Sequence, residues 1–308
     1  MNILLVGYYG FDNFGDEWLC RQTQKLIHST LPSCHIKIAV LRPNSLLHVK
    51  RNSITEMFTA ILWADQIIFG GGGIFQNQTS RLSPFYYAAI MVTAFLFRRP
   101  YGLIGHSIGP LSGIMTTWFI KLLLKRTSLC TLRHPSILVP TAIISPDLSY
   151  YNASFLPHGT STGKVAICFR QNWITPELST FLQSYPVSIS LICQDQQDLH
   201  YQKVIALPPT DLPQLSLIIS MRYHACVWAS LHGVPFIALG DDPKLNTIAT
   251  NCGQCYLPLS EAYLLSQKID DYRINWTHYQ QLLAQTIPRF ISEFKPIQVA
   301  LSSTLNAS

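Results

Sequence analysis

The chain alternates short apolar runs with longer segments in which apolar residues recur every three or four positions. The short runs predict buried strands and the longer segments predict amphipathic helices. In the first half, the expected strands are 3–6, 36–41, 66–69, 101–104, 129–132 and 142–144. The expected helices are 16–30, 53–64, 84–97 and 114–125. This alternation predicts a doubly wound α/β domain.

Residues 152–163 are rich in Pro, Gly, Ser and Thr and show little periodicity, so they predict a linker. The alternation then restarts. The expected strands are 165–169, 187–193, 204–207, 217–219 and 236–239, and the expected helices are 176–184, 225–231, 244–251 and one or two at the C-terminus. We therefore expect an N-terminal Rossmann-like domain over 1–152 and a C-terminal one over 163–300, facing each other across a cleft. Residues 301–308 are small and polar and predict a frayed tail.

Composition narrows the function classes. The 308 residues are 48% hydrophobic and 12% charged, which is ample for two cores. The net charge of +6 comes without a dense Lys/Arg run, so it disfavours nucleic acid and fits anionic substrates or an anionic membrane surface. The longest apolar stretch, 85–97, is too short to span a bilayer and predicts a buried helix. Its strongly apolar character also allows the alternative that it forms a patch facing a membrane.

The cysteines and the start of the chain bear on compartment and metal. The eight cysteines are scattered, and the only close pair is Cys252 and Cys255. A lone C-x-x-C could be redox-active or half a zinc site, but no second pair has zinc-ligand spacing, so reduced core thiols are favoured. The first residues read as a strand and not as a secretory leader. We expect a cytoplasmic protein without a metal or cofactor.

Two strand-to-helix turns near the end of the chain carry the most chemistry. Arg222 and His224 follow the apolar run 217–219, and Lys244 follows the run 236–239. Such turns lie together at the carboxyl edge of a parallel sheet, where ligands bind. Arg222 and His224 are two positions apart, so they would not share a face in the middle of a helix. They can act on the same ligand only if they lie on a turn with the helix beginning around them. Asp242 is a possible N-cap with a proline after it. The alternative is a helix-starting arginine and a hydrogen-bonded histidine; the convergence of both turns favours an anion site.

Two glycine-rich segments follow strands of the first half. Gly10 and Asp16 belong to the first segment, where the glycine permits a tight turn and close ligand approach. Asp16 suits either ligand contact or the first turn of a helix. The second segment contains four successive glycines, which favour close backbone approach to a ligand over an ordinary turn. The residues of this segment that we expect to line the cleft are Gly71, Gly72, Gly73, Gln76 and Arg81, although Arg81 alone would read as a surface arginine.

Three further basic residues stand at strand ends. His106 suits either the cleft or a structural, hydrogen-bonded role. Arg133 is a better ligand candidate, because a guanidinium can hold a carboxylate or phosphate with two hydrogen bonds. Arg170 follows the first strand of the second domain and is a candidate for the same reason.

Taken together, these motifs resemble the polysaccharide pyruvyl transferase family of the CsaB type. The resemblance runs along nearly the whole chain. Its most specific part is MRYHACVWASLHGVPFIAL at 221–239 followed by DDPK at 241–244; the other motifs are GYYGFDNFGDE, GGGGIFQNQTSR, IGPL, LRH, PDLSY and CFR. The resemblance implies a GT-B-like fold of two Rossmann-type domains with the active site between them.

The resemblance also implies an activity and a set of site residues. Family members transfer a pyruvyl group from phosphoenolpyruvate to a sugar, forming a cyclic ketal and releasing phosphate. Their acceptor is a hexosamine of a cell-wall or exopolysaccharide precursor, carried on undecaprenyl diphosphate. Such an acceptor implies peripheral contact with the inner membrane surface. The family's phosphoenolpyruvate site corresponds here to Arg133, Arg222, His224 and Lys244.

The residue types suit this chemistry independently. Phosphoenolpyruvate carries a carboxylate and a phosphate, so it needs several cations, and an imidazole is a natural general acid near neutral pH. The chain departs from the family pattern at Tyr223, His106 and His134, and its second domain is shortened. These departures bear on the acceptor more than on the donor. Two alternatives remain open: a GT-B glycosyltransferase that uses a nucleotide sugar, and a non-catalytic relative of the fold.

Overall fold

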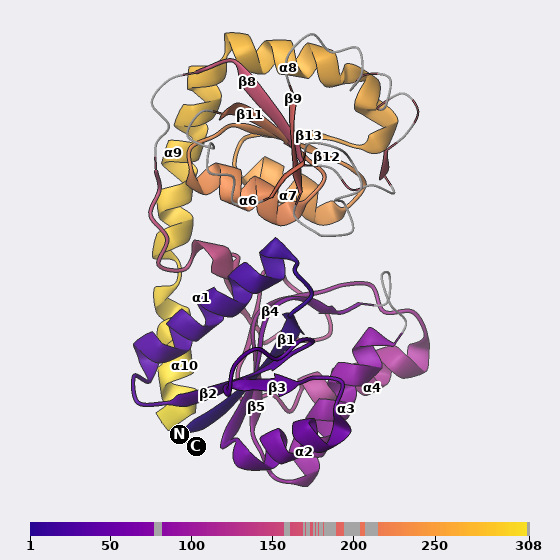
Figure 1. Cartoon of the computed structure of the whole chain (residues 1–308), viewed down its shortest axis with the longest axis vertical. Coiled ribbons are helices and arrows are strands. Elements are labelled where there is room, and N and C mark those ends of the chain that lie inside the picture. The colour runs from indigo at the N-terminus through magenta and orange to yellow at the C-terminus, as the bar shows by residue number, and fades with distance from the viewer. Residues whose placement is uncertain are drawn as a thin grey trace. The chain divides into compact units, whose positions relative to one another are not determined.

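The structure is a computed structural model that describes residues 1–76, 82–156, 161–168, 170, 173–174, 176, 178, 181, 189–193, 204–206 and 215–306. It forms two compact units (Figure 1). Unit 1 comprises Met1–Tyr151 and Glu293–Ser308, and unit 2 comprises Asn152–Ser292. Within the described residues, no helix is both long and apolar enough to cross a membrane.

Unit 1 is built on a seven-stranded parallel sheet in the order β3-β2-β1-β4-β5-β6-β7. The strands are β1 (Asn2–Tyr9), β2 (His35–Val40), β3 (His48–Lys50), β4 (Gln66–Phe75), β5 (Tyr101–Ile108), β6 (Cys130–Leu132) and β7 (Ile143–Ile144). The strand order reverses between β1 and β4, where Leu4 pairs with Ile67. Ligands of doubly wound folds bind at the carboxyl edge of such a reversal point.

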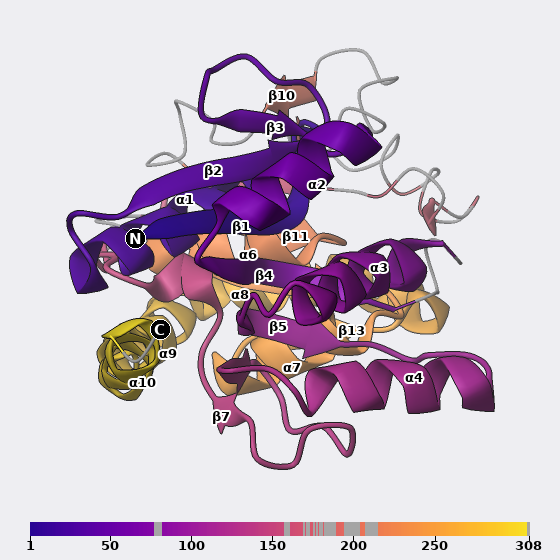
Figure 2. The same cartoon turned by 90° about the horizontal axis from the view of Figure 1, so that it is seen from below.

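Helices cover both faces of this sheet, as Figure 2 shows. They are α1 (Phe14–Thr30), α2 (Ile54–Trp63), α3 (Ser83–Leu96), α4 (Ile114–Leu124), the 3-10 helix η1 (Leu148–Tyr150) and α10 (Lys295–Asn306). Helix α1 starts at Phe14, two residues before the expected start, because Asn13 caps it by accepting from the Gly15 and Asp16 amides at 3.1 and 3.3 Å. Asp16 and Glu17 lie in its first turn, where the helix dipole favours negative charge.

The C-terminal segment corrects the expected frayed tail. Residues 295–306 are helical, and Ile297, Leu301 and Leu305 are buried. Their spacing of four places them on one face of α10, and the helix returns the chain to unit 1. Its Gln298 amide donates to the hydroxyl of Tyr151 at 3.0 Å.

Unit 2 repeats the topology of unit 1 with a six-stranded parallel sheet in the order β10-β9-β8-β11-β12-β13. The strands are β8 (Lys164–Cys168), β9 (Ile189–Cys193), β10 (Val204–Ala206), β11 (Leu215–Ser220), β12 (Phe236–Leu239) and β13 (Cys255–Leu257). Its helices are α6 (Tyr223–Leu231), α7 (Pro243–Asn251), the 3-10 helix η5 (Leu259–Leu264), α8 (Leu265–Ile274) and α9 (Trp276–Ser292). The order reverses between β8 and β11. Most of the helix expected at 176–184 lies outside the described residues.

Two strands were missed by the sequence analysis. Strand β3 has only three residues, and β13 begins at Cys255, the second half of the C-x-x-C pair. Cys252 is the buried C-cap of α7, and neither cysteine of the pair forms a disulfide. The pair therefore marks a helix end followed by an edge strand.

Candidate functional site

The carboxyl edge of the unit 2 sheet brings four of the predicted donor-site residues to adjacent turns. Ser220, the last residue of β11, pairs with Cys168 of β8 on one side and Ala238 of β12 on the other. Each of these three strands leads into a turn: the turn after β8 carries Arg170, the turn after β11 carries Arg222 and His224, and the turn after β12 carries Lys244. Strands β8 and β11 flank the reversal point, so these turns occupy the position where this topology binds ligands.

The Arg222 turn has the conformation expected from the two-residue spacing. Arg222 is the N-cap of α6, with extended φ and ψ of −120° and 125°. Ser220 fixes it from both sides: the Arg222 amide donates to the Ser220 hydroxyl at 3.0 Å, and that hydroxyl donates to the Arg222 carbonyl at 2.8 Å. No side chain caps α6. The first amides of this helix are therefore oriented toward the carboxyl edge, as in helix-terminal anion sites.

His224 lies in the first turn of α6 and is 8% exposed. The ring of Tyr223 packs against it edge to face, with centroids 5.2 Å apart. Such packing limits the rotamers of the imidazole. The structure thus holds His224 in a confined position beside Arg222.

The Lys244 turn confirms the predicted cap. Asp242 is the N-cap of α7 and accepts from the Lys244 amide at 3.0 Å, and Pro243 is the first helical residue. Lys244 itself is partly exposed. A capped helix start fixes the direction in which the lysine leaves the backbone.

The third turn contributes Arg170. Its guanidinium carbon lies 4.5 Å from the ring centroid of Trp173, within cation–π range. A Cβ at Gly240 would collide with the Trp173 ring. Gly240 also has a φ of 135°, so both its backbone conformation and the neighbouring Trp173 ring require a glycine at this position. The contact between Trp173 and Gly240 connects the β8 turn to the β12 turn.

The carboxyl edge of the unit 1 sheet gathers part of the predicted acceptor set. Gly10 and Gly72 both have positive φ, 78° and 107°. A Cβ on Gly72 would lie 3.3 Å from the carboxylate of Asp16. Gln76 follows β4 and packs against Gly109 in the next turn. Gly72 and Asp16 lie close together at the reversal point of the unit 1 sheet, whereas Gly10 packs against the end of β2. The acceptor role of these residues stays a prediction, as does that of Gly73.

A cavity of about 570 Å³ opens at the same edge, beside the ends of β1 and β2. Its lining is rich in both charge signs; it includes Gly10, Asp12, Glu17, Arg21, Arg42 and His48. Glu17 is partly engaged, since it accepts from the Gly10 amide at 2.6 Å. No sequence pattern singles out Arg42 and His48, because they follow β2 in a segment without periodicity.

Helix α1 packs closely against the first two glycines of the β4 run. A Cβ on Gly71 would lie 2.9 Å from Leu19 of α1, so its free side faces helix packing and not a cleft. Leu5 and Thr23 likewise occupy the space that a Cβ on Gly70 would need. The glycine run is therefore partly explained by close approach of α1 to β4, which continues as a strand to Phe75.

His106 fits the structural, hydrogen-bonded alternative, because it is fully buried. Its Nε2 lies 2.9 Å from the carbonyl oxygen of Phe69, and its Nδ1 lies 3.2 Å from that of Gly72. Burial, and to a smaller extent the positive charge of Arg133, lowers the pKa of His106 to about 4. His106 braces the glycine segment of β4 from inside the sheet and does not line a cleft.

Arg133 is a buried residue of unit 1, with a charged partner that the sequence analysis did not foresee. Its Nη1 pairs with the carboxylate of Asp147 at 2.7 Å, and its Nε donates to the Gly105 carbonyl at 2.9 Å. Asp147 also accepts from the Ser149 amide at 2.8 Å. The donor role of Arg133 stays a prediction. Arg81 lies outside the described residues.

Arg51 is a second buried arginine that sequence patterns did not reveal. It donates to the Gly7 carbonyl at 2.9 Å and to the Tyr87 hydroxyl at 3.3 Å. Its guanidinium carbon also lies 4.7 Å from the Tyr86 ring centroid and 4.9 Å from that of Phe11. Arg51 thereby ties the end of β1 to α3. It follows the unpredicted strand β3, which explains why no signal identified it.

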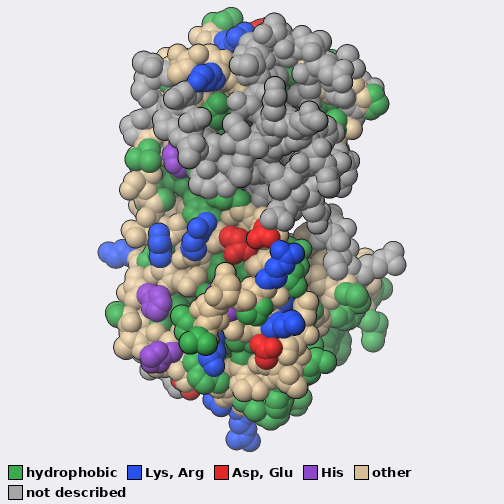
Figure 3. Space-filling model, in the orientation of Figure 1, with side chains coloured by type: hydrophobic (Ala, Val, Ile, Leu, Met, Phe, Trp, Pro, Cys, Tyr) green, Lys and Arg blue, Asp and Glu red, His purple; other side chains and the backbone are tan. Residues whose placement is uncertain are grey.

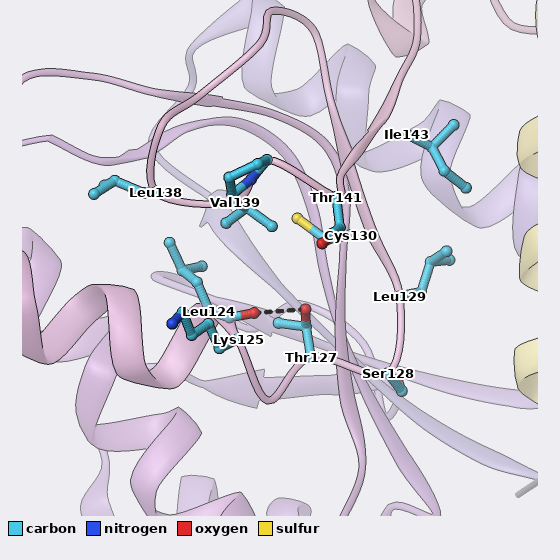
Figure 4. A pocket seen from close by; sticks show the side chains of 11 residues that line it. Leu124, Lys125, Thr127, Ser128, Leu129, Cys130, Leu138, Val139, Thr141 and Ile143 are labelled. Carbon is cyan, nitrogen blue, oxygen red and sulfur yellow. Dashed lines mark hydrogen bonds between the residues drawn. The ribbon is translucent and has the colours of Figure 1, made fainter.

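A further cavity, of about 420 Å³, lies at the opposite side of the unit 1 sheet (Figure 4). It is bounded by the end of α4 and the start of β6, where the Thr127 hydroxyl donates to the Leu124 carbonyl at 2.8 Å. Cys130 lies in its wall, and burial raises the pKa of this thiol to about 12. The cavity contains none of the predicted site residues, and it is at the amino edge of β6, where this topology does not bind ligands.

Comparison with known proteins decides the family. The sequence model of polysaccharide pyruvyl transferases matches residues 13–208, which is more than half of the chain. The chain belongs to the polysaccharide pyruvyl transferase family. The match includes Asp16, Arg133 and Arg170 and ends before Arg222. No curated protein matches the sequence.

Solved structures show that this pyruvyl transferase family member has a GT-B fold. A UDP-N-acetylglucosamine 2-epimerase from Neisseria meningitidis, bound to UDP-GlcNAc, is 13% identical, with a TM-score of 0.56 and coverage of 100% of both chains. A putative enzyme of the same name from Listeria monocytogenes is 10% identical, with a TM-score of 0.59 and coverage of 100% of this chain and 98% of the other. Anabaena HepE in complex with UDP is 13% identical, with a TM-score of 0.57 and coverage of 100% and 99%. At these identities the likeness concerns the fold.

Proposed function

We propose that this family member transfers the pyruvyl group of phosphoenolpyruvate to a hexosamine of a lipid-linked polysaccharide precursor, forming a cyclic ketal and releasing phosphate. The observation that supports this most is the carboxyl edge of the unit 2 sheet. There, Arg170, Arg222, His224 and Lys244 stand on three adjacent turns beside a helix N-terminus.

The cations suit the two anionic groups of phosphoenolpyruvate. Guanidinium groups hold carboxylates and phosphates through paired, charge-assisted hydrogen bonds, and a lysine acts as a mobile point charge. The amides at the start of α6 add donors without adding charge. In our proposal Arg222, Lys244 and Arg170 hold the donor, and Arg133 contributes as the family resemblance implies.

The reaction needs one proton donor and two sugar hydroxyls. His224 as imidazolium protonates the methylene carbon of the enol, which becomes the methyl group, and positive charge develops at the central carbon. One hydroxyl oxygen adds to that carbon, the second replaces the phosphate, and the two hydroxyl protons leave to His224 and to the departing phosphate. The burial of His224 beside Arg222 keeps water from the acid and favours delivery of its proton to the substrate.

The acceptor would use the unit 1 edge formed by Gly10, Asp16, Gly72, Gly73 and Gln76. The sugar hydroxyls are neutral hydrogen-bond donors, which match a carboxylate and an amide better than a cluster of cations. With an undecaprenyl-diphosphate carrier, the protein would work at the cytoplasmic face of the membrane, in peripheral contact with it.

The test is phosphate release from phosphoenolpyruvate in the presence of a hexosamine acceptor, with the ketal product identified by mass spectrometry. Wild-type protein should release one phosphate for each ketal formed. His224→Ala should lower kcat by at least about a hundredfold, as expected for loss of a general acid. His278→Ala, at an exposed histidine of α9, is the matched control and should retain wild-type turnover.

Two outcomes would overturn this proposal. Turnover of His224→Ala at the wild-type rate would remove His224 from the chemistry. Absence of ketal with any hexosamine acceptor, together with sugar transfer from a UDP-hexosamine, would replace the proposal with a GT-B glycosyltransferase. Folding of each variant is checked by circular dichroism and thermal melting.

A further inference from the structure

The outer face of α3 and α4 in unit 1 carries large apolar side chains that the protein leaves uncovered. On α4, Ile114 is 90%, Met115 79% and Trp118 61% exposed, and Leu122 continues the same face one turn later. The neighbouring end of α3 adds Phe95 and Leu96 at 48% and 69%. Soluble proteins rarely expose so many contiguous apolar residues without a partner.

Helices α3 and α4 pack against each other, and we call their exposed apolar face the α3/α4 surface. It comprises Phe85, Phe95, Leu96, Phe97, Ile114, Met115, Trp118 and Leu122. The guanidinium carbon of Arg126, just after α4, lies 4.5 Å from the ring centroid of Phe95 on α3. The Phe97 ring meets Phe58 of α2 at 5.2 Å. In Figure 3, hydrophobic side chains gather along the side of unit 1 on which Figure 1 draws α3 and α4.

The sequence segment that carries this surface has formal charges of a single sign. Residues 66–146 contain seven Lys or Arg and no Asp or Glu. Among these, Arg98, Lys125 and Arg126 are exposed at the C-terminal ends of α3 and α4. The apolar surface is therefore bordered by cations, without an acidic residue from its own segment to neutralise them.

We propose that the α3/α4 surface docks onto an anionic lipid bilayer, with Trp118, Met115 and Ile114 entering the headgroup–acyl boundary and Lys125 and Arg126 facing the phosphates. An apolar face with an exposed tryptophan and a basic border is the pattern of helices that lie in a membrane interface. A second copy of this chain fits less well, because two such surfaces would bring like charges together.

This inference deepens the proposed function and rests on it for the membrane-borne acceptor. Lipid binding itself requires no substrate. The surface would keep unit 1, with its predicted acceptor residues, at the membrane from which a lipid-linked sugar is presented.

The experiment is flotation of the full-length protein with vesicles of phosphatidylglycerol and phosphatidylcholine, compared with phosphatidylcholine alone. The wild type should float with the anionic vesicles and be released by high salt. Ile114→Ser combined with Trp118→Ser should weaken partitioning at least about tenfold, because two apolar side chains no longer enter the interface. Lys125→Gln should weaken it by about fivefold.

Matched controls occupy other faces. Ile274→Ser combined with Tyr263→Ser removes two equally exposed apolar residues of unit 2, and Lys25→Gln removes an exposed cation of α1. Each control should float like the wild type. No flotation of the wild type, or equal loss in test and control variants, would overturn the proposal. So would a concentration-dependent dimer in light scattering that the Ile114/Trp118 variant abolishes, since the occupant would then be a second copy.

The outcome is separable from that of the proposed chemistry. The α3/α4 variants should form ketal normally on a water-soluble hexosamine acceptor and lose rate only on a vesicle-borne one. Flotation without ketal formation would leave the docking surface standing and overturn the chemistry. Loss of ketal formation on the soluble acceptor in these variants would show that they damage more than docking.

Discussion

Protonation of His106 should destabilise unit 1 in mild acid. The ring is fully buried, and its pKa is lowered from 6.5 to about 4, chiefly by burial and further by the charge of Arg133. The carbonyls of Phe69 and Gly72 act in the opposite direction, because they accept from a protonated ring, but they do not compensate. His106 therefore favours the folded state while it is neutral.

The size of the effect follows from the two pKa values. Between pH 6.5 and about 4, the unfolded chain binds a proton that the folded chain does not. Stability is thus fully present above about pH 6.5 and is lost as the pH falls toward 4. Each pH unit corresponds to about 1.4 kcal/mol, so the loss is about 2 kcal/mol at pH 5 and about 3 kcal/mol near pH 4.

The assay compares the wild type with His106→Gln, whose amide can still donate to a carbonyl but does not titrate. Hydrogen exchange of the β5 amides reports the opening of unit 1, which global melting of a two-unit chain would blur. The difference in opening free energy between the two proteins should shrink by about 2 kcal/mol from pH 7 to pH 5. A difference that stays constant over this range would refute the reasoning.

Two further predictions concern side-chain contacts within each unit. Asp147→Asn should destabilise unit 1 by about 3–5 kcal/mol in urea unfolding, because the guanidinium of Arg133 would lose its buried partner. The double variant Asp147→Asn/Arg133→Met should recover part of that stability. Unchanged stability in both variants would contradict a structural ion pair. Gly240→Ala should displace Trp173 and with it Arg170, so the KM for phosphoenolpyruvate should rise at least about tenfold while α7 still forms. An unaltered KM would show that the β12 turn has no part in donor binding.

The sequence predicted most of the two sheets because their strands are short, apolar and bounded by glycines and polar turns. It also predicted the Asp242 cap and the start of α6 near Arg222, since both follow from local rules of helix initiation. These local rules are enough to place the turns that carry the donor residues at one sheet edge.

The features that the sequence does not predict depend on contacts between residues far apart in the chain. The Arg133–Asp147 pair joins residues whose contact no local pattern encodes, and β3 is too short to show periodicity. The small, polar residues of 301–308 predict a frayed tail, although Ile297, Leu301 and Leu305 repeat every four positions and are buried within unit 1. The stretch 85–97 was expected to be buried, yet Phe95 and Leu96 are exposed, which periodicity in an almost wholly apolar helix cannot reveal.

The central claim is that the carboxyl edge of the unit 2 sheet binds phosphoenolpyruvate, and calorimetric titration of the donor tests it most directly. Arg222→Gln and Lys244→Gln should each weaken binding by about ten- to a hundredfold, as expected for the loss of a charge-assisted contact. Arg273→Gln, an exposed arginine on α8 of the same unit, is the control and should bind like the wild type. Undiminished affinity in both site variants would contradict the account.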